Sequence, residues 1–357
     1  MKNHGDSLFR NALYFGIGLM STVASTVSDR TRNKSEWARG KVVVITGGSR
    51  GLGLALAEEF GSRGAKLVLA ARNETDLSNA RSQLLERGAI RSADDALISA
   101  VDLRKPEDAA RLIEEATRRF GRVDVLINNA GIITVGPVEN QSLEQFRDAM
   151  ESNFYSGLHC TLAVLPQMLG RREGAIANVT SIGGRIAVPH MLPYTASKFA
   201  AVGLSEGLGM ELRSKGIRVT TICPGLMRTG SHRNAQFTGD ASREYRWFSV
   251  AATMPGASAS ARHAARKIAN GMAAGCAEIA ITPQALLAAR FGNLSPELKR
   301  VVMMGMHMAL PDPVEGQNTP RRGEDVRDRE VFPATTIGDS VARRYNQAGA
   351  FAGAASD

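Results

Sequence analysis

The chain has 357 residues, 43% of them apolar, so it is long enough to bury a sizeable core in one large domain or two smaller ones. Its formal charge of +9 is a feature of many proteins that bind nucleic acids or membrane surfaces. The arginines are scattered along helical stretches and aromatic residues make up only 5%, so we predict no nucleic-acid partner. The cysteines Cys160, Cys223 and Cys276 fit neither a disulfide framework nor a metal site, which suits a reducing, cytoplasmic compartment.

Residues 1–35 are predicted to form an apolar helix followed by a linker. The stretch 11–28 is uncharged, but it is short and weakly apolar for a membrane span. No clear cleavage site or twin-arginine pair marks it as a signal peptide. We interpret it as a helix that packs on the body or on a partner, or that contacts a membrane peripherally. A membrane anchor and a cleaved signal peptide are the alternatives.

The middle of the chain alternates between continuous apolar runs and helical patterns. Strands are predicted at Val42–Thr46, Lys66–Ala71, Ala96–Val101, Val123–Ile127, Ala175–Val179, Arg218–Ile222 and Glu278–Ile281. Helices are predicted at Leu54–Phe60, Asp76–Arg87, Pro106–Phe120, Leu143–Leu169, Tyr194–Ser214 and Ala261–Ala274. Strands of this kind, separated by helices, are typical of a parallel sheet covered on both faces. We therefore predict an α/β fold with a doubly wound, parallel seven-stranded sheet in one main domain over residues 36–283.

Two turns at strand ends are rich in small residues. The first strand runs into the glycine turn Thr46–Gly53, directly before a predicted helix. In this strand–turn–helix context, backbone amides and the helix N-terminus can hold a pyrophosphate. The run Asn128–Gly131 follows the fourth strand, where small residues let the chain approach a ligand closely.

A tyrosine and a lysine are spaced for proton transfer. Pro193 suits a helix start, so Tyr194 and Lys198 lie four apart on one helical face. An ammonium beside a phenol stabilises the phenolate, so we predict that the pKa of Tyr194 falls toward neutrality. Ser181, just after a predicted strand, can share a substrate oxygen with that phenol. Such a group gives or takes a proton while a hydride moves. Taken alone, the motif also fits an ordinary surface pair.

Together, these motifs resemble those of the classical short-chain dehydrogenase/reductase family, in the same order along the chain. The glycine turn, the run Asn128–Gly131, Ser181 with the Tyr-x-x-x-Lys pair, and Pro224-Gly225-x-x-x-Thr229 each match a family motif. Asn153 lies where the family has a helix asparagine, and Ser156 departs mildly from a position often held by glycine. The resemblance implies a Rossmann fold and a homodimer or homotetramer.

The resemblance also implies roles for individual residues. The implied catalytic residues are Asn153, Ser181, Tyr194 and Lys198. Tyr194 would be the acid or base, Ser181 would orient the substrate oxygen, and Lys198 would also hold the nicotinamide ribose. Asn153 would hold a water that links Lys198 to solvent, or else serve only as a packing amide. The implied cofactor-binding residues are Thr46, Gly47, Ser49, Arg50, Gly51, Leu52, Gly53, Arg72, Asp102, Leu103, Asn129, Ala130, Gly131, Tyr194, Lys198, Pro224, Gly225 and Thr229.

The end of the second strand indicates which nicotinamide cofactor is preferred. A fold that prefers NAD usually places an acidic residue there, but this chain reads Ala70-Ala71-Arg72-Asn73. Arg50 and Arg72 are suited to grip a 2′-phosphate, so we predict that NADP(H) is preferred over NAD(H). Two solvated surface arginines are the alternative. Asp102 would flank the adenine, or simply cap the next segment.

The predicted function is an NADP(H)-dependent oxidoreductase that interconverts a carbonyl and a secondary alcohol. The segment 226–254 should cover the pocket, and its aromatic and basic residues suit a hydrophobic substrate. The same residues would fit equally well a core within this covering segment, which we call the lid, with its arginines exposed to solvent. The alternatives in function are a nucleotide-sugar epimerase or dehydratase, and a non-catalytic NADP(H) sensor. The 13 positions from Ser181 to Tyr194 disfavour the first, and the intact catalytic set disfavours the second.

Beyond residue 283 the chain departs from the family pattern. Helices at Leu286–Phe291 and Pro296–Leu310 form a predicted helical extension over 284–310. The methionine-rich part of the second helix is an adaptable apolar surface. With the apolar N-terminal stretch, it is expected to serve peripheral membrane contact or self-association. Residues 311–357 are predicted to be an extended or disordered polar tail without a catalytic role, because Val341–Tyr345 is too short to form a core.

Overall fold

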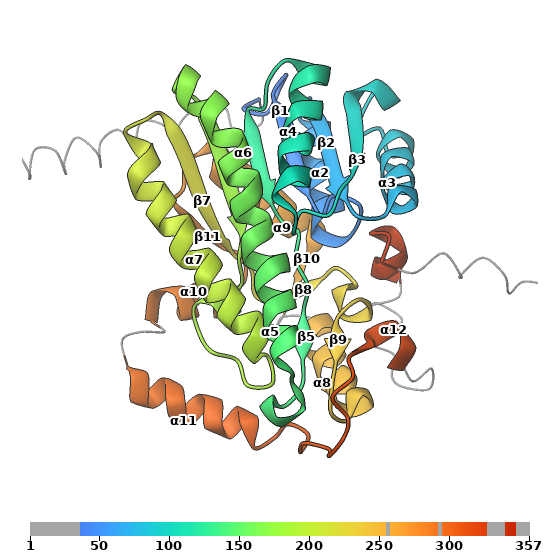
Figure 1. The fold of residues 1–357 in the computed structure, drawn as a ribbon, viewed down its shortest axis with the longest axis vertical. Coiled ribbons are helices and arrows are strands. Elements are labelled where there is room, and N and C mark those ends of the chain that lie inside the picture. Colours follow the sequence, from blue (N-terminus) through green and yellow to red (C-terminus); the bar gives the residue numbers. More distant parts are fainter. Residues whose placement is uncertain (1–35, 255–257, 292–294, 327–339, 348–357) are drawn as a thin grey trace, which may run out of the picture.

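The computed structural model describes residues 36–254, 258–291, 295–326 and 340–347 (Figure 1). The predictions made for residues 1–35 lie outside the described residues, as do those for 327–339 and 348–357.

A seven-stranded, fully parallel sheet runs through the centre of the molecule, as predicted. Its strands are β1 Val42–Thr46, β2 Lys66–Ala71, β3 Ala96–Ala100, β4 Val125–Asn128, β6 Gly174–Val179, β7 Ile217–Cys223 and β11 Glu278–Ala280. Their order is β11-β7-β6-β4-β1-β2-β3, so the direction of winding reverses between β1 and β4. Ligands bind at such a reversal, outside the carboxyl ends of the strands.

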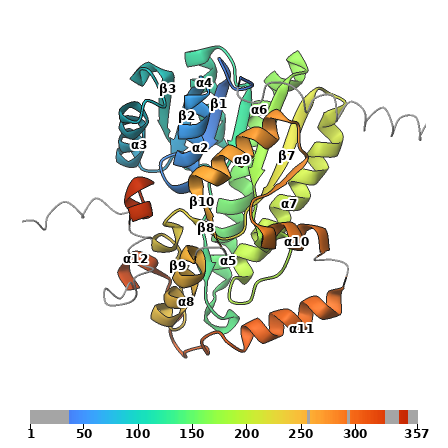
Figure 2. The same cartoon turned by 180° about the vertical axis from the view of Figure 1, so that it is seen from behind.

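Helices cover both faces of this sheet. Figure 1 shows α4 Pro106–Phe120, α6 Ser156–Arg171 and α7 Leu192–Arg213 over one face. Figure 2 shows α2 Gly51–Ser62 and α9 Ala261–Ala273 over the other, with α3 Glu74–Glu86 at its edge. Because side chains alternate along a strand, β1 serves both layers: Val43 and Ile45 join the core under α2 and α9, and Val42 and Val44 join the opposite core. This two-sided burial explains the continuous apolar runs.

The long helix predicted over Leu143–Leu169 is interrupted in the structure. Helix α5 spans Leu143–Met150, a π-helical turn spans Glu151–Tyr155, and α6 follows. A π turn inserts one residue without breaking the helical pattern, so apolar periodicity does not reveal it. It displaces Asn153 toward the cavity described below.

A smaller layer lies beyond the carboxyl ends of the main strands. It contains α8 Ala241–Thr253 and the strands β5 Thr134–Val135, β8 Met227–Arg228, β9 Gln236–Phe237 and β10 Ala259–Ser260. The C-terminal part of the chain adds β12 Arg321–Arg322 and α12 Gly323–Val326. Strands β12, β9 and β5 form one small sheet, and β10 pairs with β8. Such two-residue strands leave no periodic signal in the sequence.

The segment after the main sheet starts with α10 Pro283–Phe291 and α11 Pro296–His307. Figure 1 shows α11 standing off from the sheet at the lower edge of the molecule. Its outer face exposes apolar side chains, among them Leu298, Val301 and Met304. Within the described ranges, no helix is long and apolar enough to cross a membrane.

The structure differs from the expectation of an extended or disordered tail over 311–357. Residues 321–326 form β12 and α12, and residues 340–344 form a short helix. Ala342 and Tyr345 are buried, and Tyr345 joins the core between the main sheet and α2. The backbone amide of Gly51 donates to the Tyr345 carbonyl at 2.8 Å. A segment this short needs no core of its own, because the body supplies the apolar surface against which it packs.

Candidate active site

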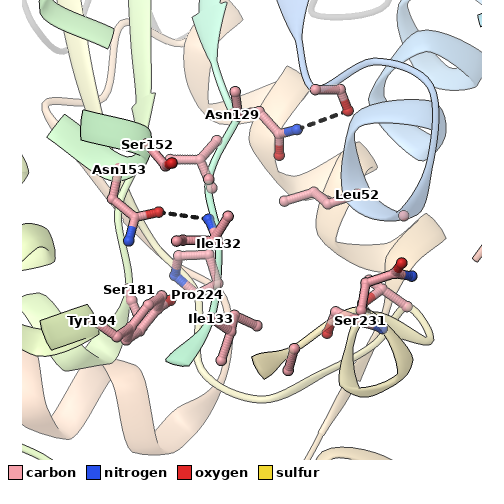
Figure 3. A pocket seen from close by; sticks show the side chains of 18 of the residues that line it. Leu52, Asn129, Ile132, Ile133, Ser152, Asn153, Ser181, Tyr194, Pro224 and Ser231 are labelled. Carbon is pink, nitrogen blue, oxygen red and sulfur yellow. Dashed lines mark hydrogen bonds between the residues drawn. The ribbon is translucent and has the colours of Figure 1, made fainter. Parts of the chain in front are cut away.

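A cavity of about 970 Å³ opens at the carboxyl ends of β1, β2 and β4 (Figure 3). This volume is at the upper end of the range of roughly 300–1,000 Å³ that is typical of ligand pockets. The cavity lies where the winding order of the sheet reverses. It runs from the glycine turn to the first turn of α7.

Glycines in the turn Thr46–Gly53 allow helix α2 to begin very close to strand β1. Gly47 and Gly51 have φ values of 63° and 58°, in the left-handed region that favours glycine. A Cβ at Gly53 would overlap the carbonyl oxygen of Gly47, so α2 can begin this close to β1 only with glycine there. The turn therefore places the N-terminus of α2 at the cavity, where the Gly51 amide is already bonded to the Tyr345 carbonyl of the C-terminal segment.

Thr46 and Asn129 hold this turn against the loop after β4. The Thr46 hydroxyl accepts from the backbone amides of Asn129 and Ala130, both at 2.9 Å. The Asn129 side chain donates to the Thr46 carbonyl at 3.0 Å. Neither Thr46 nor Gly53 lines the cavity, so both act by bracing the turn. The other predicted site residues all line it.

Ser181 and Tyr194 lie together at the other end of the cavity (Figure 3). The Ser181 hydroxyl is near enough to the Tyr194 phenol to influence its pKa, and it accepts from the Gly183 backbone amide at 3.0 Å. Gly183 lies against the phenol ring, where a Cβ would sit 3.3 Å from Tyr194 Cε1. Lys198 is buried; its Nζ donates to the Val179 carbonyl at 3.0 Å and lies 5.7 Å from the Tyr194 ring centre. The three side chains therefore meet as the sequence predicted.

The prediction of a lowered Tyr194 pKa is wrong for this structure. Burial raises the pKa of Tyr194, and the Ser181 hydroxyl opposes this effect only in part. Burial also lowers the pKa of Lys198, to about 8. The spacing of two residues along a helix predicts that their side chains are close. It does not predict how deeply the two side chains are buried, and burial decides the direction of the pKa shift here. Tyr194 accordingly carries its proton at neutral pH, which is the form that donates to a carbonyl oxygen.

Asn153 uses its side chain to join three segments. Its Oδ1 accepts from the Ile132 backbone amide at 2.8 Å, and its Nδ2 donates to the Ser197 hydroxyl at 2.9 Å (Figure 3). The π turn is thus tied to the loop after β4 and to α7. A Cβ at Gly131 would overlap Asn153 Oδ1 and lie 3.6 Å from Lys198 Nζ. Glycine at this position therefore lets the Asn153 amide pack directly against the loop after β4, close to Lys198.

The turn after β7 closes this end of the cavity. The Pro224 carbonyl accepts from the Ile182 backbone amide at 2.7 Å, which joins it to the segment after Ser181. A Cβ at Gly225 would overlap the hydroxyl of Thr282, and Thr229 is buried. These contacts hold all three motif residues of this turn on the cavity wall.

The opposite end of the cavity is polar. Arg50 donates to Asn234 Oδ1 at 3.0 Å, and Arg72 lies exposed at the rim. The Asp102 carboxylate is held by Arg104, which lowers the pKa of Asp102, with Nε to Oδ1 at 3.0 Å. Asp102 is therefore already engaged locally. Leu103 is buried beside it and also lines the cavity.

The lid, residues 226–254, contains a small core of its own and also contributes side chains to the cavity wall. Phe237, Tyr245 and Phe248 pack on one another, with centroid distances of 5.6 and 6.0 Å from Phe237, so much of the aromatic content is lid core. Trp247 is partly exposed and lines the cavity, and its indole nitrogen donates to Glu244 at 2.6 Å. The substrate end of the cavity is lined mainly by apolar side chains: Ile133, Ile186, Val188, Met191, Leu226, Trp247, Phe248, Met303 and Met306.

Several of these residues were not predicted as site residues. Met303 and Met306 reach the cavity from α11, and Asn234, Arg322 and Gln347 reach its polar end. The sequence shows the methionine cluster, but it does not show which of the methionines face the cavity. No local signal marks Asn234, Arg322 or Gln347, because each reaches the site through a long-range contact.

Comparison with known proteins places the chain in a family. The family model for short chain dehydrogenases matches residues 41–238. The chain is 37% identical over 214 residues to the dehydrogenase/reductase SDR family member 7B of Mus musculus, covering 60% of this chain and 65% of that protein. It is 35% identical over 248 residues to the 11-beta-hydroxysteroid dehydrogenase A of Arachis hypogaea, covering 68% of each.

A solved structure supports the same grouping. The crystal structure of a variant of actinorhodin polyketide ketoreductase with NADPH is 30% identical, with a TM-score of 0.60. The match covers 68% of this chain and 96% of that protein. Our chain covers less than two thirds of the length of the first curated relatives that it matches. The matched range and these identities show that the chain belongs to the short-chain dehydrogenase family.

Proposed function

We propose that this protein is an NADP(H)-dependent oxidoreductase that interconverts a carbonyl and a secondary alcohol on a hydrophobic substrate. The observation that carries the proposal is the placement of Ser181, Tyr194 and Lys198 together on the wall of one cavity, beside its apolar lining. The cofactor supplies or accepts the hydride. In reduction, the Tyr194 phenol gives its proton to the substrate oxygen, and in oxidation the phenolate takes that proton.

The remaining site residues bind and orient. Ser181 holds the substrate oxygen beside Tyr194, and Lys198 binds the nicotinamide ribose hydroxyls. Asn153 positions this group by tying the π turn to α7, and in our proposal it also supports a water that connects Lys198 to solvent. The turn after β7 holds the carboxamide with Pro224, Gly225 and Thr229, and Asp102 with Leu103 flanks the adenine. The glycine turn, with Ser49 and Leu52, holds the pyrophosphate.

The preference for NADP(H) is part of this proposal. No carboxylate occupies the last positions of β2 or the two residues that follow, where one would repel a 2′-phosphate; the first acidic residue is Glu74, and Asp76 also lines the cavity. Arg50 and Arg72 both line this end of the cavity. A guanidinium can donate two parallel hydrogen bonds to a phosphate, which favours the phosphorylated cofactor.

The substrate is proposed to be apolar because the walls around Tyr194 are apolar. Two relatives carry the names hydroxysteroid dehydrogenase and putative ketoacyl reductase, and both names fit this proposal. The test is a panel of ketones, aldehydes and 3-oxoacyl thioesters, with NADPH oxidation followed by absorbance. We expect turnover with large apolar carbonyls above that with small polar ones. Tight NADPH binding without turnover on any of them would favour the sensor alternative.

Assembly and location complete the proposal. We propose a homodimer or homotetramer through α6 and α7, because Leu162, Phe199 and Met210 are exposed on these helices. We further propose a cytoplasmic protein with peripheral membrane contact through the exposed apolar face of α11 and residues 1–35. Sedimentation of the full chain, and vesicle flotation with and without residues 1–35, test the two statements separately. The catalytic domain is proposed to span 36–283, with extensions at 284–310 and 311–357.

A further inference from the structure

Three arginines from separate parts of the chain converge at the adenosine end of the cavity. Arg50 belongs to the glycine turn, Arg72 follows β2, and Arg322 belongs to β12. All three line the cavity. Arg322 lies far beyond the matched range 41–238, so the family motifs do not include it.

Asn234 holds two of these arginines in place. Its Oδ1 accepts from Arg50 Nη1 at 3.0 Å and from Arg322 Nη2 at 2.6 Å. Its Nδ2 donates to Gln347 Oε1 at 2.5 Å. Pairing of β12 with β9 places Arg322 opposite Gln236 and so fixes its backbone next to Asn234. One neutral amide therefore gathers side chains from the glycine turn, the lid and the C-terminal segment.

Positive charge exceeds negative charge at this end of the cavity, whose lining includes Arg50, Arg72 and Arg322 together with the carboxylate of Asp76. Among the residues that the structure describes, no carboxylate forms an ion pair with Arg50, Arg72 or Arg322. Burial lowers the pKa of Arg50, Asp76 opposes this effect, and both Arg322 and Arg72 lower it further. Like charges brought together around a neutral amide repel one another, and an anion with two charges would relieve that repulsion.

We propose that Arg322, positioned by Asn234, is a specificity-determining residue for the phosphate on the adenosine ribose of NADP(H). In this proposal the C-terminal segment contributes a residue to a cofactor site whose other residues lie mostly in the matched range 41–238. This inference rests on the proposed use of NADP(H). It assigns a role in binding to β12, which lies in the segment predicted from sequence to be an extended or disordered tail without a catalytic role.

The test is a set of binding titrations on the full-length protein. Dissociation constants are measured by calorimetry for NADPH and NADH, and for the fragments adenosine 2′,5′-bisphosphate and adenosine 5′-monophosphate. Arg322→Ala is expected to weaken NADPH and the bisphosphate about tenfold, the effect of one charged hydrogen bond. NADH and the monophosphate should bind within about twofold of wild type. Arg322→Lys should recover part of the loss, because it keeps the charge but not the fork.

Arg321→Ala is the matched control, because Arg321 is its exposed neighbour on β12 and does not line the cavity. It should leave all four dissociation constants unchanged. Asn234→Ala should lower NADPH affinity selectively, since it releases both Arg50 and Arg322. Circular dichroism melts confirm that each variant is folded.

The results separate this inference from the proposed function. If Arg72→Ala weakens NADPH selectively but Arg322→Ala does not, NADP(H) preference stands and the role of Arg322 is overturned. If Arg322→Ala weakens NADPH and NADH equally, the residue only supports the fold, and the inference is again overturned. If wild type binds NADH as tightly as NADPH, the proposed cofactor preference itself fails.

Discussion

The two ends of the cavity are lined by different kinds of side chain, which in our proposal select their ligands by different physical means. At the adenosine end, a few guanidinium groups are aimed by directional hydrogen bonds, such as that from Arg50 to Asn234. At the substrate end, the walls are mostly apolar side chains from the lid, α7 and α11. Charged hydrogen bonds are worth roughly 1.5–3 kcal/mol each, and a single missing one changes the preferred ligand. Apolar contact contributes roughly 25 cal/mol per Å² without direction, so it selects for size more than for identity.

The same contrast predicts how strictly the site selects its cofactor and its substrate. One phosphate distinguishes NADP(H) from NAD(H), and in our proposal the arginines that line the polar end of the cavity bind it. By contrast, the substrate wall includes methionines, which adapt to many shapes. We therefore expect strict cofactor selection and broad substrate selection, with Tyr194 between the two ends as the group whose loss is most severe.

The largest expected effect is at Tyr194. Tyr194→Phe removes the proton donor but keeps the ring against Gly183, so turnover should fall by about 10²–10⁴-fold. NADPH affinity should change by less than about twofold, since the ring remains in place. Steady-state kinetics and an NADPH titration measure the two quantities. Tyr155→Phe, at an exposed tyrosine of the π turn, is the control and should retain full turnover. A Tyr194→Phe enzyme with more than a tenth of wild-type turnover would contradict the assignment.

Cofactor preference should be the next largest effect. Arg72→Ala is expected to weaken NADPH by about 10–100-fold and to leave NADH nearly unchanged. Adding Ala71→Asp should go further, because the new carboxylate repels a 2′-phosphate and can accept from ribose hydroxyls. Titration of both cofactors into the three proteins measures the change. Equal losses for the two cofactors in Arg72→Ala would mean that this arginine supports the fold rather than the phosphate.

The pH dependence of kcat/KM should show whether Lys198 must carry its positive charge for the reaction. Burial lowers the pKa of Lys198 to about 8, and it raises the pKa of Tyr194. As pH rises through about 8, Lys198 therefore loses its charge first. The kcat/KM for reduction should be level below that pH and fall about tenfold per pH unit above it. Lys198→Arg, which stays charged, should move the fall to higher pH. A wild-type profile that stays level through pH 10 would exclude Lys198 as the titrating group.

The smallest expected effect lies at the substrate end. Met306 lines the cavity from α11, whereas Met304 is 57% exposed on the outer face of the same helix. Met306→Ser should raise KM for large apolar carbonyls by about three- to tenfold, from the lost apolar contact. The KM for small carbonyls should not change, because they do not reach α11. Met304→Ser is the matched control, and an equal rise in both variants would show that the helix as a whole, not the cavity wall, matters.

Much of the fold and part of the site could be predicted because their signals are local. The bounds of β1 and β2 were predicted to the residue, since largely continuous apolar runs are read from neighbouring positions, and glycines follow β1 directly. The glycine turn and the Tyr194–Lys198 pair were equally visible. Their placement at one sheet edge follows from parallel strands whose carboxyl ends meet.

The tertiary structure alone decided features that depend on distant contacts. The π turn at Asn153 is held by partners on two other segments, and the Arg322–Asn234 bond joins residues 88 positions apart. Tyr345 became core only by packing on a body that precedes it in the chain. The direction of the Tyr194 pKa shift was also decided there, because desolvation depends on how completely the fold excludes water, and spacing along a helix carries no information about that.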